Sequence, residues 1–473
     1  MEKSLSHICN ASAYLCFIFI LALGVPVTSF AQPYPIPLLP DTSKLGQYTS
    51  RTINLLHRST QENSNEVRIL VYGQSISEQE WWLEVKRTVK ERFPFADIIM
   101  ENKAIGGFST QYLFKTVEMD VSSFYPDLVL LHIYGNNKDY ESVLATIRSR
   151  TAAEVAIMTD HYTGENRWSD TMSYHILPAL AEKYKCDLIN IRDPWKKYLT
   201  DNNLEPSALL KDGIHLNDFG NFLMAELVKP LFSFKSSIPD DPFHLLTIYQ
   251  KAERLDLRDD TLIMPFTGNR VDLVYTTSDS APHDSARVFL DESAPSTFQG
   301  TYYLTRPYNS KGEVWPWDLP AMIRVDHTNQ WVSEEWSCIF TEAKPPYTEF
   351  SFKITGSVTG RDGEGRASQD FVSPSGRVII RKGDAENGGD WHLNRSYRVL
   401  KTIVNNGDTV KWKTYSISTN VFNTSSTADS SGERSLILFQ GIPNTGHILK
   451  IKSSGGDLPA ISMIKVYRPY WNR

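Results

Sequence analysis

Three residues carry side chains that could act together in nucleophilic catalysis. Ser75 comes just after the apolar run VRILVYG (67–73), so its hydroxyl is expected at the end of a buried strand and in front of a helix N-terminus. Asp212 precedes His215 by three residues, which lets the carboxylate reach the imidazole Nδ1 and leaves Nε2 free to take the serine proton. Because serine is also a common helix N-cap, Ser75 alone is a weak signal.

Two further motifs could stabilise a negatively charged oxygen near that serine. The glycine-rich stretch NKAIGGFST (102–110) offers the backbone N–H of Gly107. The stretch YGNNKD offers the side-chain amide of Asn137, with Asn136 as the alternative donor. With the backbone N–H of Ser75, these groups would form an oxyanion hole with three donors.

All these motifs lie in a segment where short apolar runs alternate with helical patterns. Continuous apolar strands separated by helices are typical of a parallel sheet covered on both faces, which predicts a doubly wound α/β domain. The predicted strands are 67–73, 96–100, 127–134, 153–159 and 187–191, and two predicted helices are 78–93 and 216–232. The motifs follow strands or precede the last helix, and sites in such sheets form at the carboxyl ends of the strands.

At this level of detail the chain resembles the SGNH hydrolases, the superfamily of GDSL esterases and lipases. The matching positions are Ser75, Gly107, Asn137 and His215. The stretch DGIHLNDFGN (212–221) is the most specific match, and the resemblance covers about residues 67–232. It implies a flavodoxin-like fold and ester hydrolysis by the serine, with the Asp–His pair as its partners and without a metal or cofactor.

Two positions differ from the usual family pattern. Gln74 precedes the serine and Lys138 follows Asn137, where the family usually has Asp in both places. The GQS sequence resembles a variant in sialate O-acetylesterase-like and some acetylxylan-esterase-like branches. Near the pocket, the Lys138 ammonium would favour an anionic glycan; as an ordinary solvated lysine it would play no part.

Several other polar residues follow the predicted strands. Asp160 and His161 could line the pocket, and His161 could act as an alternative base or be a surface histidine. His132 lies within an apolar strand and is expected to be a core histidine. Arg167 and Asp170 could contact a polar substrate.

From about residue 236 the pattern changes to strands separated by turn residues, which predicts an all-β sandwich or jelly roll. The stretch 244–256 is the main segment with a helical period. Seven tryptophans lie in this half: Trp315, Trp317, Trp331, Trp336, Trp391, Trp412 and Trp471. They could fill the core or stack on sugar rings, and WPWDLP (315–320) is the better candidate for a ligand contact.

The N-terminus is typical of an exported protein. The apolar run 13–25 is too short to span a membrane but suits a signal peptide, with cleavage expected after Ala31. A retained N-terminal anchor is the alternative. Cleavage would remove Cys9 and Cys16, and the remaining Cys186 and Cys338 make neither a disulfide framework nor a metal motif. The mature chain is therefore expected in the periplasm or outside the cell, with no membrane span.

Length and composition agree with a protein of several domains. The chain has 473 residues, and its 49 basic and 55 acidic residues form no basic block, so a nucleic-acid partner is not expected. The predicted divisions are a signal peptide (1–31), an N-terminal linker (32–66), an SGNH hydrolase domain (67–235) and a β-sandwich domain (236–473). We expect the last two to be separable.

These observations predict an exported serine esterase that removes acyl groups, with acetyl expected, from a polysaccharide or oligosaccharide. Two other functions stay open. One is a glycan-binding protein with a degenerate hydrolase domain, favoured by Gln74 and Lys138. The other is a lipid esterase or thioesterase, which would need an apolar groove where the predicted loops are polar. The sequence does not specify the sugar, the acylated position, the substrate-binding residues or the oligomeric state.

Overall fold

The computed structural model describes residues 34–39, 41–250, 256–258, 260–277, 285–309, 321–423, 432–455 and 461–471. Residues Ile36–Arg473 form one compact unit. The predicted signal peptide (1–31), with Cys9 and Cys16, lies outside the described residues, as does the WPWDLP stretch (315–320).

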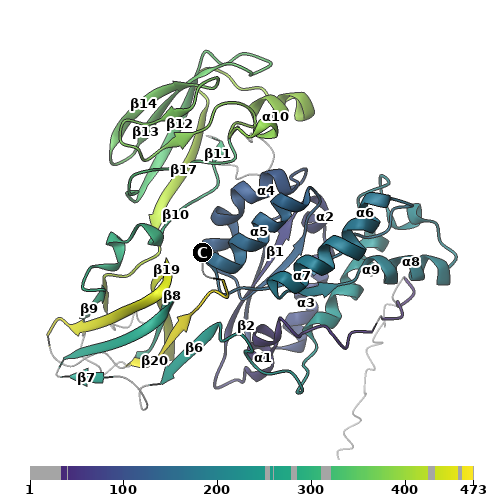
Figure 1. The fold of residues 1–473 in the computed structure, drawn as a ribbon, viewed down its shortest axis with the longest axis horizontal. Helices are drawn as coiled ribbons and strands as arrows, with labels where there is room; N and C mark the ends of the chain where they lie inside the picture. Colours follow the sequence, from purple (N-terminus) through teal and green to yellow (C-terminus); the bar gives the residue numbers. More distant parts are fainter. Residues whose placement is uncertain are drawn as a thin grey trace, which may run out of the picture. The chain divides into compact units, whose positions relative to one another are not determined.

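The first part of the unit is built on a five-stranded parallel sheet with the strand order β2-β1-β3-β4-β5 (Figure 1). Its strands are β1 (Glu66–Gly73), β2 (Asp97–Asn102), β3 (Leu128–His132), β4 (Glu154–Met158) and β5 (Asp187–Ile189). This is the flavodoxin-like order, in which the chain changes direction between β1 and β3. The predicted α/β fold is therefore confirmed.

Helices cover both faces of this sheet, which explains why its strands are continuously apolar. They are α1 (Ser50–Arg58), α2 (Ser75–Glu78), α3 (Trp81–Arg92), α4 (Thr110–Val117), α5 (Asn137–Arg150), α6 (Arg167–Thr171), α7 (Leu177–Tyr184), α8 (Arg192–Asp201) and α9 (Asp218–Val228). In β1, Ile69 and Val71 join the hydrophobic cluster that contains α1, α3, α8 and α9. Leu70 and Tyr72 point to the opposite cluster, which contains α4, α5 and α7.

Helix α1 corrects the expectation that residues 32–66 are a linker. Ile53 and Leu56 of this helix are buried in the same cluster as β1. The carboxylate of Glu154, at the start of β4, accepts hydrogen bonds from the backbone N–H groups of Arg51 and Thr52 at 2.9 and 2.8 Å. The α/β core therefore begins before residue 67.

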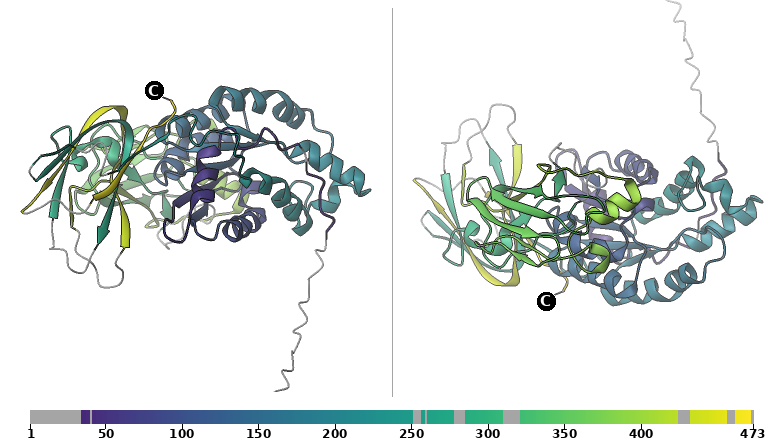
Figure 2. Two further views of the ribbon diagram at one scale, coloured as in Figure 1. Left: turned by 90° about the horizontal axis from the view of Figure 1, so that it is seen from below. Right: turned by 90° about the horizontal axis from the view of Figure 1, so that it is seen from above.

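The C-terminal part consists of antiparallel sheets, as predicted (Figures 1 and 2). One has the order β10-β17-β12-β13-β14, with β11 paired to β17; another has the order β18-β9-β19-β8-β20-β6, with β7 paired to β8; and β15 pairs with β16. The strands of the first are β10 (Tyr302–Leu304), β11 (Tyr308–Asn309), β12 (Glu334–Thr341), β13 (Ser351–Gly356), β14 (Gly360–Arg366) and β17 (Thr409–Ser416). Those of the others are β6 (Leu246–Gln250), β7 (Asp256–Arg258), β8 (Thr261–Thr277), β9 (Ser285–Leu290), β15 (Phe371–Val372), β16 (Ile379–Ile380), β18 (Val421–Asn423), β19 (Gly432–Ser453) and β20 (Ile461–Tyr467). The two large sheets each have a hydrophobic cluster of their own.

Two segments of this part differ from the sequence prediction. The stretch 244–256, expected to have a helical period, contains β6, which pairs with β20 from Leu246–Tyr467 to Gln250–Met463. Backbone pairing at the sheet edge therefore overrides the local pattern. A helix that was not predicted, α10 (Leu393–Leu400), buries Leu393 in the cluster of the β12 sheet.

The two halves share buried contacts, which argue against a clean separation near residue 236. Ile323 and Ala385 belong to the hydrophobic cluster of α4, α5 and α7. The Arg306 guanidinium bonds to the buried Asp120 carboxylate at 2.5 Å. A cut near residue 236 would expose this shared core to water.

Candidate functional site

The predicted catalytic residues lie around an open cleft of about 790 Å³ at the carboxyl edge of the parallel sheet. The cleft is lined by Gln74, Ser75, Glu78, Gln79, Gly106, Gly107, Tyr134, Lys211, Asp212, Ile214 and His215. These residues come from segments that follow β1, β2 and β3 and from the loop before α9. Loops far apart in the sequence therefore meet here because parallel strands end at the same edge.

The backbone after β1 places Ser75 at this edge. Gly73 has φ +153°, and a Cβ atom there would lie 2.0 Å from the backbone oxygen of His132 on β3. Only glycine lets the chain pass this close to the neighbouring strand. Gln74 is extended, and Ser75 then begins α2 with its side chain partly exposed.

The three predicted catalytic side chains form a continuous hydrogen-bonded relay. The Ser75 Oγ lies 3.0 Å from His215 Nε2, and His215 Nδ1 lies 2.7 Å from Asp212 Oδ2. When Nδ1 carries its proton and donates to the carboxylate, Nε2 is a free base that faces the serine hydroxyl. The sequence spacing therefore brings these three groups together.

The Asp212 carboxylate also holds the loop that carries the histidine. Its Oδ1 accepts hydrogen bonds from the backbone N–H groups of His215 at 2.8 Å and Ile214 at 3.2 Å. The backbone bond from His215, followed by the imidazole, lowers the pKa of Asp212 to about 2. Gly213 takes a φ of +82° in this turn. Asp212 is therefore ionised across the ordinary pH range, as a partner of an imidazolium must be.

His161 is hydrogen-bonded to the loop that carries His215, a role that the sequence did not suggest. Its ring is buried, and Nε2 lies 2.8 Å from the backbone oxygen of Ile214. Burial lowers the pKa of His161 to about 4, so the neutral ring donates its Nε2–H to that oxygen. His161 is therefore neither a surface histidine nor an alternative base for Ser75.

The glycine-rich stretch 102–110 contributes Gly107 to the cleft lining, and the peptide bond after Gly107 is hydrogen-bonded at both its oxygen and its N–H. Gly107 has φ +73° and is exposed at the cleft. Its carbonyl oxygen accepts a hydrogen bond of 3.1 Å from Arg395 Nη2 on α10. The N–H of the next residue, Phe108, donates to Ile105 at 3.1 Å. The peptide after Gly107 is thus fixed at both ends, and one of the two partners comes from the C-terminal half.

The stretch YGNNKD places Asn136, Asn137 and Lys138 outside the cleft lining, unlike the motifs that carry Ser75, Gly107 and His215. Asn137 is the first residue of α5; it is exposed and is not among the residues that line the cleft. Asn136 caps this helix, accepting from the Asp139 N–H at 2.9 Å and donating to the Asp139 carboxylate at 2.6 Å. Lys138 is exposed outside the cleft lining. Asn136 is therefore occupied by the helix cap, and the oxyanion role of Asn137 stays a prediction.

His132 at the end of β3 and Asp160 after β4 form a buried polar pair. His132 Nε2 and Asp160 Oδ1 lie 3.5 Å apart, and both side chains are almost fully buried. Burial lowers the pKa of His132 to about 3 and raises that of Asp160 to about 7. His132 is thus a neutral core histidine, as expected, but among the described residues neither of its ring nitrogens has a hydrogen-bond partner, so the expectation of a satisfied histidine is not met.

Arg167 and Asp170, which the sequence suggested as contacts for a polar substrate, lie on α6. Asp170 accepts a 2.7 Å bond from Arg192 Nε, whereas Arg167 is exposed. Neither residue is part of the cleft lining.

Among the residues that the structure describes, no group of three or more His, Cys, Asp or Glu side chains could hold a metal ion. Cys186 and Cys338 are free and buried. Within the described ranges, no helix is both long and apolar enough to cross a membrane.

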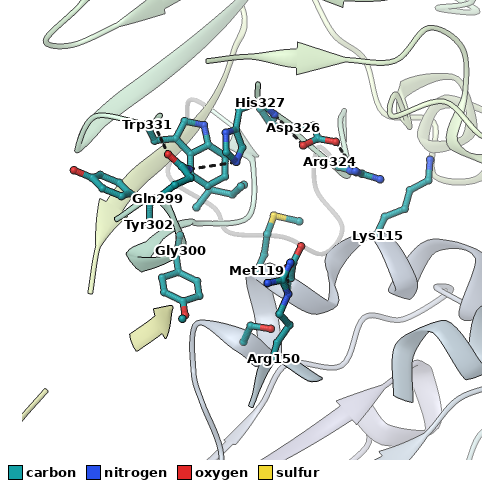
Figure 3. A pocket seen from close by; sticks show the side chains of 16 residues that line it. Lys115, Met119, Arg150, Gln299, Gly300, Tyr302, Arg324, Asp326, His327 and Trp331 are labelled. Carbon is teal, nitrogen blue, oxygen red and sulfur yellow. Dashed lines mark hydrogen bonds and ion pairs between the residues drawn. The ribbon is translucent and has the colours of Figure 1, made fainter. Parts of the chain in front are cut away.

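A second cavity, of about 380 Å³, lies between the end of α4 and segments of the C-terminal half (Figure 3). The charged side chains around it include two ion pairs, Arg150–Glu118 at 2.9 Å and Arg324–Asp326 at 2.5 Å. The ring of Trp331 packs against His327 with centroids 3.8 Å apart, and only 7% of Trp331 is exposed. The two arginines among the described residues that line this cavity are therefore paired with carboxylates.

The topology and the Ser75–His215–Asp212 relay agree with the resemblance to the SGNH hydrolases. No family model matches the chain, and no curated protein matches it. Among solved structures, the chain is similar to a two-domain esterase (CEX) active on acetylated mannans, at 13% identity and TM-score 0.35, covering 89% of this chain and 95% of that one. The same esterase co-crystallised with mannopentaose matches at 12% identity and TM-score 0.33, with 87% and 93% covered. A catalytic mutant of Axe2, an acetylxylan esterase from Geobacillus stearothermophilus, matches at 18% identity and TM-score 0.33, with 36% and 96% covered.

Proposed function

We propose that this chain is an exported serine esterase that removes O-acetyl groups from a polysaccharide or oligosaccharide. The observation that carries the proposal is the relay from Ser75 Oγ through His215 to Asp212, at 3.0 and 2.7 Å, in an open cleft. Serine, histidine and aspartate in this order and geometry activate a hydroxyl for acyl transfer. Export rests on the predicted signal peptide with cleavage after Ala31.

In the proposed mechanism, Ser75 Oγ attacks the carbonyl carbon of the ester while His215 Nε2 takes the hydroxyl proton. The Asp212 carboxylate stabilises the imidazolium and keeps its orientation. The N–H groups of Ser75 and Gly107 and the amide of Asn137 are the proposed donors to the oxyanion. The imidazolium then protonates the leaving sugar oxygen, and the acyl group remains on Ser75. His215 next activates a water molecule, which releases the acid and restores the serine.

We propose a small acyl group on a polar substrate. The cleft lining includes the polar side chains of Gln74, Glu78, Gln79 and Lys211, together with the exposed Ile214. A long acyl chain would need an extended apolar groove to leave water. Acetyl is therefore the proposed acyl group, and a carbohydrate supplies the polar remainder of the substrate.

The first experiment compares Ser75→Ala with Ser77→Ala in the full chain. Ser77 lies in the same short helix but is buried, and it bonds to the His132 oxygen at 3.1 Å. We expect Ser75→Ala to lower kcat on p-nitrophenyl acetate by at least about a thousandfold, because the nucleophile is lost. Ser77→Ala should retain turnover and lose only stability. Unchanged turnover in Ser75→Ala would exclude the proposed nucleophile.

A substrate panel then tests the ester class. p-Nitrophenyl acetate should be turned over faster than the butyrate and octanoate esters, and acetate should be released from acetylated mannan or acetylated xylan. A preference for octanoate would identify a lipid esterase instead. Binding of glycan without hydrolysis of any ester would identify a degenerate hydrolase domain.

A further inference from the structure

The first turn of α6, which follows β4, carries a large aromatic side chain at the carboxyl edge of the parallel sheet. Trp168 is 42% exposed, whereas the next residue, Ser169, is buried. An exposed indole near a cleft offers a flat apolar face to a ligand. Nothing in the catalytic relay uses this indole.

Ring contacts connect Trp168 with the cleft. The Trp168 and Tyr134 rings meet edge to face, with centroids 5.7 Å apart, and Tyr134 lines the Ser75 cleft. On its other side Tyr134 meets the buried ring of His132 at 5.2 Å, also edge to face. The indole is therefore the outermost of three rings that lead from the core to the rim of the cleft.

The backbone that carries Trp168 is held in place without any ligand. The side chain of Asn166 accepts hydrogen bonds from the N–H groups of Trp168 at 3.0 Å and Ser169 at 3.2 Å. Arg192 holds both sides of the loop, donating to the His161 oxygen at 3.1 Å and to Asp170 at 2.7 Å. A platform that is already ordered loses little conformational entropy when a ligand binds.

From this arrangement we propose that Trp168, with Tyr134, forms a subsite that stacks on a pyranose ring of the glycan next to the acetylated sugar. A pyranose ring offers an apolar face of C–H groups between its hydroxyls, and an exposed, ordered indole matches that face. The subsite extends the proposed esterase function and rests on it for the identity of the substrate. It would help to hold a chain of sugars across the cleft while Ser75 attacks one ester.

The test compares Trp168→Ala and Trp168→Phe with Phe95→Ala in the full chain. Phe95 is 50% exposed but lies just before β2, at the opposite edge of the sheet. The substrates are acetylated mannan oligosaccharides, acetylated xylan oligosaccharides and p-nitrophenyl acetate. Binding of the same oligosaccharides to Ser75→Ala and to the double variant with Trp168→Ala is measured by calorimetry.

We expect Trp168→Ala to raise KM for at least one acetylated oligosaccharide by about 3- to 10-fold, the range of an aromatic contact. This factor should exceed the change in KM for p-nitrophenyl acetate, Trp168→Phe should recover part of the loss, and Phe95→Ala should match the wild type. Equal KM values for the oligosaccharides in wild type and Trp168→Ala would overturn the subsite. If the wild type hydrolyses no ester, the proposed function fails; calorimetric binding that weakens with Trp168→Ala would then still support the subsite, and unchanged or absent binding would overturn it.

Discussion

Aromatic side chains are placed differently in the two regions of this molecule. In the antiparallel C-terminal region, Trp336 and Trp412 are fully buried and Trp331 and Trp391 nearly so. In the α/β region, Trp168 reaches solvent beside the cleft that contains Ser75. The described tryptophans of the C-terminal region are therefore mostly core residues, the WPWDLP candidate (315–320) lies outside the described residues and stays a prediction, and Trp168 is exposed at the carboxyl edge of the parallel sheet.

The same contrast holds for polar groups. Around the C-terminal cavity the described charges include two ion pairs, and Trp331 is covered by His327. At the carboxyl edge of the parallel sheet, by contrast, the relay ends at a partly exposed serine hydroxyl. The C-terminal region reaches the catalytic edge through Arg395, which holds the Gly107 loop. In the proposed mechanism, the chemistry therefore belongs to the α/β region and the C-terminal region supports it.

The largest effect expected after that of Ser75 concerns His215, because it moves the proton. If the proposed mechanism follows that of known serine hydrolases, His215→Ala should lower kcat on the order of 10⁶-fold and Asp212→Asn on the order of 10⁴-fold. The aspartate only orients and stabilises the imidazolium, and asparagine can still accept one loop hydrogen bond. Steady-state kinetics with p-nitrophenyl acetate check this order. A larger loss in Asp212→Asn would mean that base and orienting residue are assigned wrongly.

The next effect concerns the third oxyanion donor. Asn137→Ala should lower kcat by about 10²–10³-fold with little change in KM, because the oxyanion forms only near the transition state. Asn136→Ala should leave kcat nearly unchanged and lower the free energy of unfolding by about 1 kcal/mol, since it removes the cap of α5. Urea unfolding and kinetics of both variants provide the measurement. The opposite pattern would show that the motif is placed one residue off.

A smaller effect tests whether the C-terminal region supports the site. Arg395→Ala removes the hydrogen bond to the Gly107 oxygen and should lower kcat by about 3- to 30-fold. Arg398 lies on the same helix but is exposed and bonds to Glu386, so Arg398→Ala is the matched control and should match the wild type. Equal kcat values for the two variants would separate the C-terminal region from catalysis.

The smallest effect on catalysis is expected at the buried Asp160, where the change is in stability. Burial raises its folded-state pKa from 3.8 to about 7, so the unfolded chain releases this proton first as pH rises. The contribution of Asp160 to stability is therefore complete below about pH 4 and is lost as pH rises through 7. Asp160→Asn lacks this loss, and its free energy of unfolding relative to wild type should rise from pH 4.5 to pH 7.5.

Urea unfolding at several pH values measures this difference. The comparison with wild type removes the contributions of the other buried groups, which include Glu154, with a pKa raised to about 7, and His132 and His161, with lowered pKa values. A constant difference between variant and wild type across that range would contradict a protonated Asp160 in the folded state.

The sequence by itself determined the parallel sheet and the hydrogen-bonded relay of Ser75, His215 and Asp212. Both depend on local information: apolar runs that alternate with helices, and Asp212 placed three residues before His215 in one loop. The strand order then follows from few alternatives, because crossovers between parallel strands are right-handed and short. Ser75 joins the relay since the carboxyl ends of these strands meet at one edge.

Only the tertiary structure decided the contacts between distant segments. The bonds from His161 to Ile214 and from Arg395 to Gly107, and the approach of Trp168 to Tyr134, join residues whose separation in the sequence follows no periodic pattern. The strand β6 was likewise decided by its partner β20, because pairing at a sheet edge depends on a segment more than 200 residues away. Whether a tryptophan is buried in a core or exposed to solvent also depends on the packing of the whole chain, which composition does not give.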